Sequence, residues 1–283
     1  MTGTYNIDTL LDGIVTLPSL PSTVNRVTHL VNAPDSSLSD VAKALQTDPA
    51  LAIKTLRLVN SAYYGLANKI ISVDHAVALL GMKVIKNLVF TATVFETFNK
   101  GTGALLRHSV SCGVVMRTII PSVPGFDDMD TEEAFVYGLL HDVGKIIFEQ
   151  FLPKEVESAI LLSRTRGIPV FEAERYVIGV DHAELGGHLA QRWGLSKELV
   201  AAISGHHNLA ACTLEAARPL AATLAIADFI CNACAIVSVP GATPYLPEEM
   251  WGTAGIPIAS YPRILHAFFD SLGTVDELIE LQQ

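Results

Sequence analysis

The chain has 283 residues, of which half are hydrophobic and 17% are charged. This composition predicts a globular protein with one large or two smaller cores and excludes an intrinsically disordered chain. The first residues, MTGTYNIDTLLDG, do not resemble a secretory signal peptide, and no run of 18 apolar residues predicts a membrane span. Four cysteines are too few for a disulfide scaffold, so we expect a cytoplasmic protein.

The net charge of −10 is unevenly distributed along the chain. Residues 1–100 carry 8 basic and 7 acidic side chains, which leaves 11 basic and 22 acidic side chains in residues 101–283. Nucleic-acid binding requires clustered Lys and Arg, so the acidic second part argues against a nucleic-acid partner. The same charge favours bound cations.

Apolar residues recur at helical spacing almost throughout, so we expect an all-α fold with few or no strands. Residues 38–45 predict a helix, and Ser37 and Asp40 can form a capping box at its start. Asp48 followed by Pro49 is a typical start of the next helix, which Gly65 should end. The stripe that this helix should bury is Leu51, Thr55, Leu58 and Val59.

Ser72 is expected to cap a further helix, which Gly81 should break or bend. Two helices joined at Gly81 also suggest a helix-turn-helix motif. Only Lys83 and Lys86 supply positive charge there, so two packed core helices are the better interpretation.

The segment NKGTG, residues 99–103, predicts a boundary between an N-terminal helical part, 1–100, and a second part, 101–283. The second part should be mostly loop over about 239–257 and should end in a last helix near 260–273 that packs Ile264, Leu265, Phe268 and Phe269. Its other predicted helices cover 104–120, 131–150, 154–166, 170–178, 182–193, 197–206 and 215–237.

The stretch GLLHDVGK contains the adjacent pair His141 and Asp142. Neighbours on a helix point about 100° apart, so they can share one ion only if both lean into the same cavity. Further candidates lie on or at the ends of other predicted helices: His108, His182, His206, His207 and Asp228.

Asp228 lies in the middle of the apolar segment LAIADFI. Burying a carboxylate alone costs several kcal/mol, so a cation or a donor should meet it. Imidazoles and carboxylates around one interior point suit a divalent transition metal such as iron, manganese, nickel or zinc. His29, His75, His188 and His266 fit no ligand pattern, and Cys231 and Cys234 are interpreted as small core residues.

The order His108, His141-Asp142, Asp228 resembles the H…HD…D signature of the HD superfamily of metal-dependent phosphohydrolases. Five segments within about residues 17–230 resemble, more narrowly, the HDOD proteins, which carry the HD-related output domain of bacterial signalling. The resemblance implies an HD-like helical core with an N-terminal helical subdomain and a regulatory role. The segments are LPSLPSTVNRVTHLV, TDPALAIKTLRLVNSAYYG, VDHAVALLGMKVIKNLVF, EEAFVYGLLHDVGK and HAELGGHLAQRWGLSKELVAAISGHH.

The resemblance also implies a ligand set. His108, His141, Asp142 and Asp228 match the ligands of one metal ion, and His182, His206 and His207 match additional ligands in two-metal relatives that hydrolyse cyclic di-GMP. Those relatives carry a Gly-Tyr-Pro motif soon after the double histidine; here the chain reads HHNLAACTLEAARPL, which argues against cyclic di-GMP hydrolysis. In active HD enzymes the lysine that matches Lys145 contacts substrate phosphate; the alternative for Lys145 is an ion pair with Asp142 in the empty site.

Two functions therefore remain open. The first is a signalling module with one or two metal ions in its core, which binds a protein partner or a small phosphorylated ligand and no membrane. The second is a metal-dependent phosphohydrolase in which Asp142 and Lys145 are catalytic, with Lys145 neutralising the oxyanion.

Overall fold

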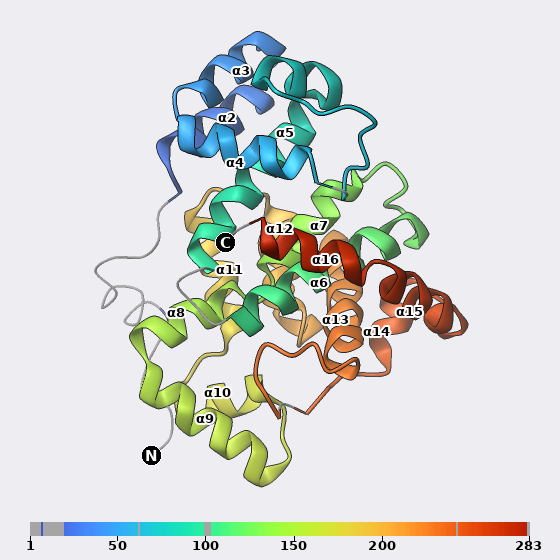
Figure 1. Cartoon of the computed structure of the whole chain (residues 1–283). Coiled ribbons are helices and arrows are strands. Elements are labelled where there is room, and N and C mark those ends of the chain that lie inside the picture. The colour runs from blue at the N-terminus through green and yellow to red at the C-terminus, as the bar shows by residue number, and fades with distance from the viewer. Residues whose placement is uncertain (1–6, 8–19, 62, 99–102, 242, 282–283) are drawn as a thin grey trace. The chain divides into compact units, whose positions relative to one another are not determined.

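The computed structural model describes residues 20–61, 63–98, 103–241 and 243–281, together with Ile7. All regular elements in these ranges are helices, as predicted (Figure 1). The helices form two compact units. The small unit comprises Pro18–Asn99 and Leu272–Gln283, and the large unit comprises Lys100–Ser271.

The predicted boundary at 99–103 lies mostly outside the described residues. Residues 272–283, which the sequence grouped with the second part, cluster with the small unit. In that unit Leu281 lines the same groove as Ile53 and Leu56, so the two chain segments meet at this groove.

Five helices build the small unit: α2 (Ser22–Asn32), α3 (Leu38–Gln46), α4 (Pro49–Val59), α5 (Val73–Phe98) and α16 (Leu272–Glu280). The predicted helix caps are present. Ser37 and Asp40 form a capping box at the start of α3, and the side chain of Asp48 accepts a hydrogen bond from the backbone N–H of Leu51 at the start of α4. The stripe predicted for α4 is buried, but α4 ends before Gly65. The side chain of Asn60 bonds instead to the backbone of Ile70 and ends the helix.

Gly81 breaks α5 as predicted, with φ 80° and ψ 164°. Among the described residues, Val73–Val94 is the one helical stretch long and apolar enough to cross a membrane by length and composition. The break at Gly81 interrupts this stretch, and 56% of its apolar 18-residue window is buried inside the protein. Both features are those of a core helix.

The large unit contains ten described α-helices, several of which begin or end within one or two residues of their predicted limits. Two predictions were wrong in detail: the helix predicted over 131–150 is two helices, and Phe269, predicted to pack, is 51% exposed. The described residues of 239–257 are mostly loop, as predicted, and include one short α-helix. The helices are α6 (Gly103–Ile119), α7 (Thr131–Leu140), α8 (Val143–Phe151), α9 (Pro153–Arg166), α10 (Val170–Val177), α11 (His182–Arg192), α12 (Lys197–Gly205), α13 (Arg218–Ala233), α14 (Glu249–Ala254) and α15 (Tyr261–Asp270).

Two glycines let the helices of the large unit approach closely. A Cβ atom on Gly138 of α7 would collide with the backbone of Cys112 on α6. A Cβ atom on Gly144 of α8 would collide with the carbonyl oxygen of His182 at the start of α11. These contacts bring the segment between α7 and α8 next to both α6 and α11.

Candidate metal centre

The structure brings all seven predicted ligands together inside the large unit. They come from five places in the chain: α6, the turn between α7 and α8, the start of α11, the end of α12 and the middle of α13. All are buried except His207, which is half-buried. The seven are His108, His141, Asp142, His182, His206, His207 and Asp228.

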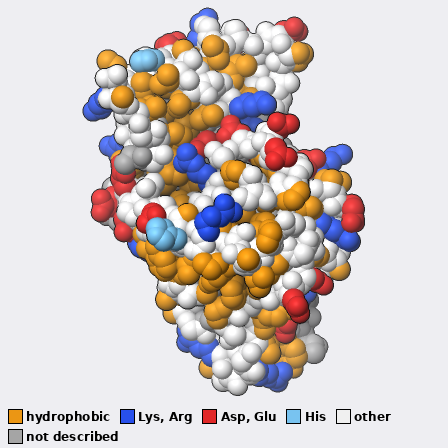
Figure 2. Space-filling model, turned by 90° about the vertical axis from the view of Figure 1, so that its right-hand side faces the viewer, with side chains coloured by type: hydrophobic (Ala, Val, Ile, Leu, Met, Phe, Trp, Pro, Cys, Tyr) orange, Lys and Arg blue, Asp and Glu red, His pale blue; other side chains and the backbone are white. Residues whose placement is uncertain are grey.

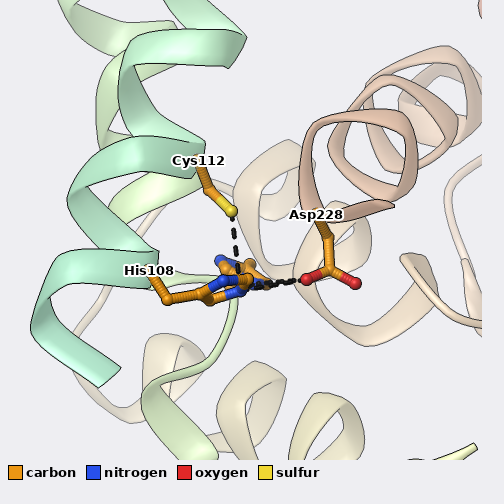
Figure 3. Close-up of side chains that lie close together, drawn as sticks. His108, Cys112 and Asp228 are labelled. Atoms are coloured by element: carbon orange, nitrogen blue, oxygen red, sulfur yellow. Dashed lines mark hydrogen bonds and ion pairs between the residues drawn. The ribbon is translucent and has the colours of Figure 1, made fainter. Parts of the chain in front are cut away.

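The first group of donor atoms lies between α6, α13 and the turn after α7. Nε2 of His108 is 3.2 Å from Nε2 of His141 and 3.0 Å from a carboxylate oxygen of Asp228. Nε2 of His141 is 3.6 Å from the same oxygen. Figure 3 shows His108 and Asp228 facing each other from their two helices.

The second group lies between α11 and the end of α12. Nε2 of His182 is 2.9 Å from Nε2 of His207, and the donor atoms of these two residues and His206 all lie within 4.8 Å of one another. The adjacent residues His206 and His207 therefore both direct a donor atom into this group. Asp142 lies between the groups, with one carboxylate oxygen 3.5 Å from His108 and the other 3.1 Å from His182.

Each of the four buried imidazoles is held through its Nδ1 atom. Nδ1 lies 2.7 Å from a backbone carbonyl oxygen in His108 and in His141, and 2.6 Å from one in His206. In His182 it lies 2.6 Å from the carboxylate of Glu174. Because these oxygens accept hydrogen bonds, Nδ1 carries the proton, and in a neutral ring the Nε2 lone pair faces the centre.

This arrangement fits a cation. Lone pairs on Nε2 atoms that face each other at 3.2 Å and 2.9 Å repel unless a proton or a metal ion lies between them. The buried Nε2 of His206 and one carboxylate oxygen of Asp142 make no hydrogen bond. Buried polar atoms without partners are costly, and metal coordination would satisfy both.

Electrostatics favour ionised carboxylates and a neutral His206. Burial would raise the pKa of Asp142, but the charges of His141 and Lys145 hold it well below its usual value. Burial lowers the pKa of His206 to about 3, and the charge of His141 adds to this effect. Burial also opposes a charge on His182, yet the Glu174 carboxylate outweighs it and raises the pKa of His182 to about 9.

Lys145 lies on the first turn of α8, and its ammonium group makes two hydrogen bonds. It donates to the carboxylate of Asp142 at 2.6 Å and to the hydroxyl of Ser238 at 2.9 Å. Both residues predicted to be catalytic thus form an ion pair between the buried carboxylate of Asp142 and the partly buried ammonium group of Lys145. Lys145, Ser238 and Asp228 also line a pocket of about 40 Å³ beside the centre.

Sequence reasoning missed several residues that contact the ligands. Asn232 donates to Asp228 at 2.7 Å, and the thiol of Cys112 lies 3.6 Å from Nε2 of His108. Each is four residues from the ligand it contacts, so helical spacing contains a signal for both. Glu174 comes from α10, and nothing in the sequence connects it to His182. His29, His75, His188 and His266 are absent from the metal-type clusters of the described residues.

Comparison with known proteins identifies relatives over most of the chain. The sequence pattern of the HDOD domain matches residues 17–209. A crystal structure of an HDOD domain protein with unknown function from Geobacter sulfurreducens is 27% identical, with a TM-score of 0.79 and coverage of 96% of each chain. A Shewanella amazonensis SB2B protein, provisionally named a phosphohydrolase, is 26% identical, with a TM-score of 0.73 and coverage of 97% of this chain and 98% of its own.

An uncharacterized protein from Treponema pallidum (strain Nichols) is 28% identical over 239 residues, which are 83% of this chain. The match covers 45% of that protein, so the chain spans about half the length of this curated relative. The HDOD pattern, in contrast, covers well over half of the present chain, and two structures that align along nearly their whole length share its fold. The chain therefore belongs to the HDOD domain family.

Proposed function

We propose that this protein is a regulatory HDOD module of bacterial signal transduction whose core binds one or two divalent transition-metal ions. The observation that supports this proposal is the set of Nε2 atoms that face two ionised carboxylates in the buried centre. His108, His141 and Asp228 would hold one ion, and His182, His206 and His207 the other, with Asp142 between them. Iron, manganese, nickel and zinc all suit such donors, and a bound ion would supply positive charge and Lewis acidity.

The size of the adjacent pocket favours regulation over catalysis. Pockets that bind small molecules measure roughly 300–1,000 Å³, whereas one water molecule occupies about 30 Å³. The pocket beside the centre measures about 40 Å³, so it has room for a water but not for a phosphoester. The Gly-Tyr-Pro motif is also absent after His206-His207.

A groove in the small unit supports binding of a signalling protein or a small phosphorylated ligand. It measures about 650 Å³, which lies within the range of ligand sites. Ile53 and Ile71 line it and are 56% and 81% exposed. Arg57 and Lys69 supply positive charge at the same groove, which suits an anionic group on the ligand.

A nucleic-acid partner and an oxidising compartment are less well supported. Figure 2 shows Lys and Arg side chains in separate small groups, among acidic and hydrophobic ones, on the face that it draws. Phosphate-backbone binding needs a continuous basic surface. All four cysteines are free, which is consistent with the cytoplasm that we expect.

Phosphohydrolase activity is the second candidate, because the Lys145 ammonium lies beside the centre and lines its pocket. In that case Lys145 would exchange its bond to Ser238 for a substrate phosphate oxygen, while Asp142 keeps the ammonium in place. The pocket would also have to widen.

Metal analysis and an activity screen distinguish these proposals. We expect about one or two equivalents of transition metal in protein purified without chelator, and less than about a tenth of an equivalent would contradict both functions. Phosphomonoesters, cyclic dinucleotides and nucleotides are then tested with wild type and Asp142→Ala. No difference between the two proteins supports the module, whereas turnover that Asp142→Ala abolishes supports the enzyme.

A further inference from the structure

Cys112 places a sulfur atom at the first group of donor atoms. It lies one turn after His108 on α6, so both side chains point from the same face of the helix (Figure 3). Its Sγ atom is 3.6 Å from Nε2 of His108 and within 4.8 Å of the donor atoms of His141 and Asp228. The side chain is fully buried and is not part of a disulfide.

The three separations from Nε2 of His108 to the other donors match the edges of a tetrahedral site. At ordinary zinc–ligand distances, two N or O donors lie about 3.3 Å apart, and a sulfur and a nitrogen lie about 3.6 Å apart. The observed separation is 3.2 Å for His108 and His141, and 3.0 Å for His108 and Asp228. The sulfur–nitrogen separation of 3.6 Å equals the expected edge.

We propose that Cys112 is a thiolate ligand of the ion held by His108, His141 and Asp228. The inference rests on the proposed metal centre and adds a ligand beyond the H…HD…D set. A coordinating thiol gives up its proton, so a sulfur–metal bond forms while the S–H proton leaves to solvent.

The chemical consequence concerns the identity of the metal. Thiolate is a soft donor that favours zinc, cadmium and cobalt over manganese and magnesium. Without Cys112 the first group offers two imidazoles and one carboxylate, which select less strongly between these ions. Cys112 therefore makes this position a zinc-type site.

Cobalt(II) is the probe that tests the sulfur ligand directly. The full-length protein is loaded with cobalt, and its absorption spectrum is recorded for wild type, Cys112→Ser and the control Cys234→Ser. Cys234 is half-buried and directly follows α13. We expect a thiolate-to-cobalt charge-transfer band in the near ultraviolet for wild type and Cys234→Ser. The band should be lost in Cys112→Ser while the visible bands of bound cobalt remain.

A second measurement covers the case in which the variant does not fold. Cadmium-113 NMR of the wild-type protein should show a resonance shifted downfield into the range of sulfur ligation. A charge-transfer band that persists in Cys112→Ser, or cobalt and cadmium that bind wild type without any sulfur signature, would overturn the proposal and leave the metal centre intact. If neither cobalt nor cadmium binds the wild-type protein, the metal centre itself is overturned.

Discussion

Asp228→Asn tests the metal centre with a minimal change of shape. The Asp228 side chain is nearly buried, and one of its oxygens lies 3.0 Å from His108 and 3.6 Å from His141. The same oxygen accepts a hydrogen bond from Asn232 at 2.7 Å. Asparagine keeps an oxygen at this position and removes the negative charge, so the variant should fold but bind a cation weakly.

The expected magnitude follows from ligand linkage. An ion present at 100 times its dissociation constant stabilises the folded state by about 2.7 kcal/mol. For a unit of about 170 residues, each kcal/mol raises Tm by roughly 2–4 °C, so wild type should gain about 5–11 °C. If the variant binds about 100-fold more weakly, the same ion concentration adds only about 0.4 kcal/mol, or roughly 1–2 °C.

Thermal melts followed by circular dichroism, in chelator and in added zinc, measure these shifts. Glu132→Gln is the matched control, because Glu132 is a buried acid of the same unit that pairs with Arg117 at 3.4 Å. In chelator, we expect the Glu132→Gln control to have a lower Tm than wild type. Added zinc should raise the Tm of the control by as much as it raises that of wild type. An equal zinc-induced shift in Asp228→Asn and wild type would refute the assignment of Asp228 as a ligand.

Three further perturbations test the surroundings of the centre. Glu174→Gln should weaken metal binding about 10- to 100-fold by calorimetry, and in chelator the pKa of His182 should fall below about 9 in a histidine NMR titration, because the carboxylate that raises it is gone. Lys145→Met should cost about 3 kcal/mol in urea unfolding in chelator, since it removes the ammonium group that pairs with the buried Asp142; unchanged stability would argue against the ion pair. Gly144→Ala should lower Tm because its Cβ meets the His182 carbonyl, whereas Gly252→Ala, which has open space, should leave Tm equal or slightly higher.

Local sequence rules predicted those parts of the fold that neighbouring residues determine. The capping box of Ser37 and Asp40 and the break at Gly81 depend on residues within one turn, and the structure contains both. The short helix α14 was missed because its segment is rich in proline and glycine. Met250 and Ala254 are buried where α14 packs on α13, and this tertiary contact outweighs the local composition.

The ligands of the candidate centre could be predicted from their residue types and from their order in the chain. Histidines and acids on apolar helices are unusual enough to be noticed, and Asp228 in particular required a partner. The residues that orient the ligands were not predictable in the same way. Glu174 holds His182 from a different helix, and the carbonyl of Ile236 holds His108 although any residue could supply it.

The turn between α7 and α8 explains how two neighbouring residues serve one centre. On a continuous helix His141 and Asp142 would point about 100° apart. Instead α7 ends at Leu140, Asp142 leaves helical geometry with φ −98° and ψ 10°, and α8 begins at Val143. Both side chains then reach the same interior point, and Nε2 of His141 lies 3.5 Å from Asp142.

The sequence has no proline at this turn, and no residue of the turn has a positive φ angle. The hydrophobic periodicity alone therefore predicted one continuous helix over 131–150. The causes lie elsewhere in the chain. Gly138 lets α7 contact α6 closely, and Gly144 lets α8 contact the start of α11, and one straight helix is not expected to satisfy both contacts. The break is therefore a consequence of packing against two partners, and it allows an adjacent His-Asp pair to lie between the two groups of donor atoms.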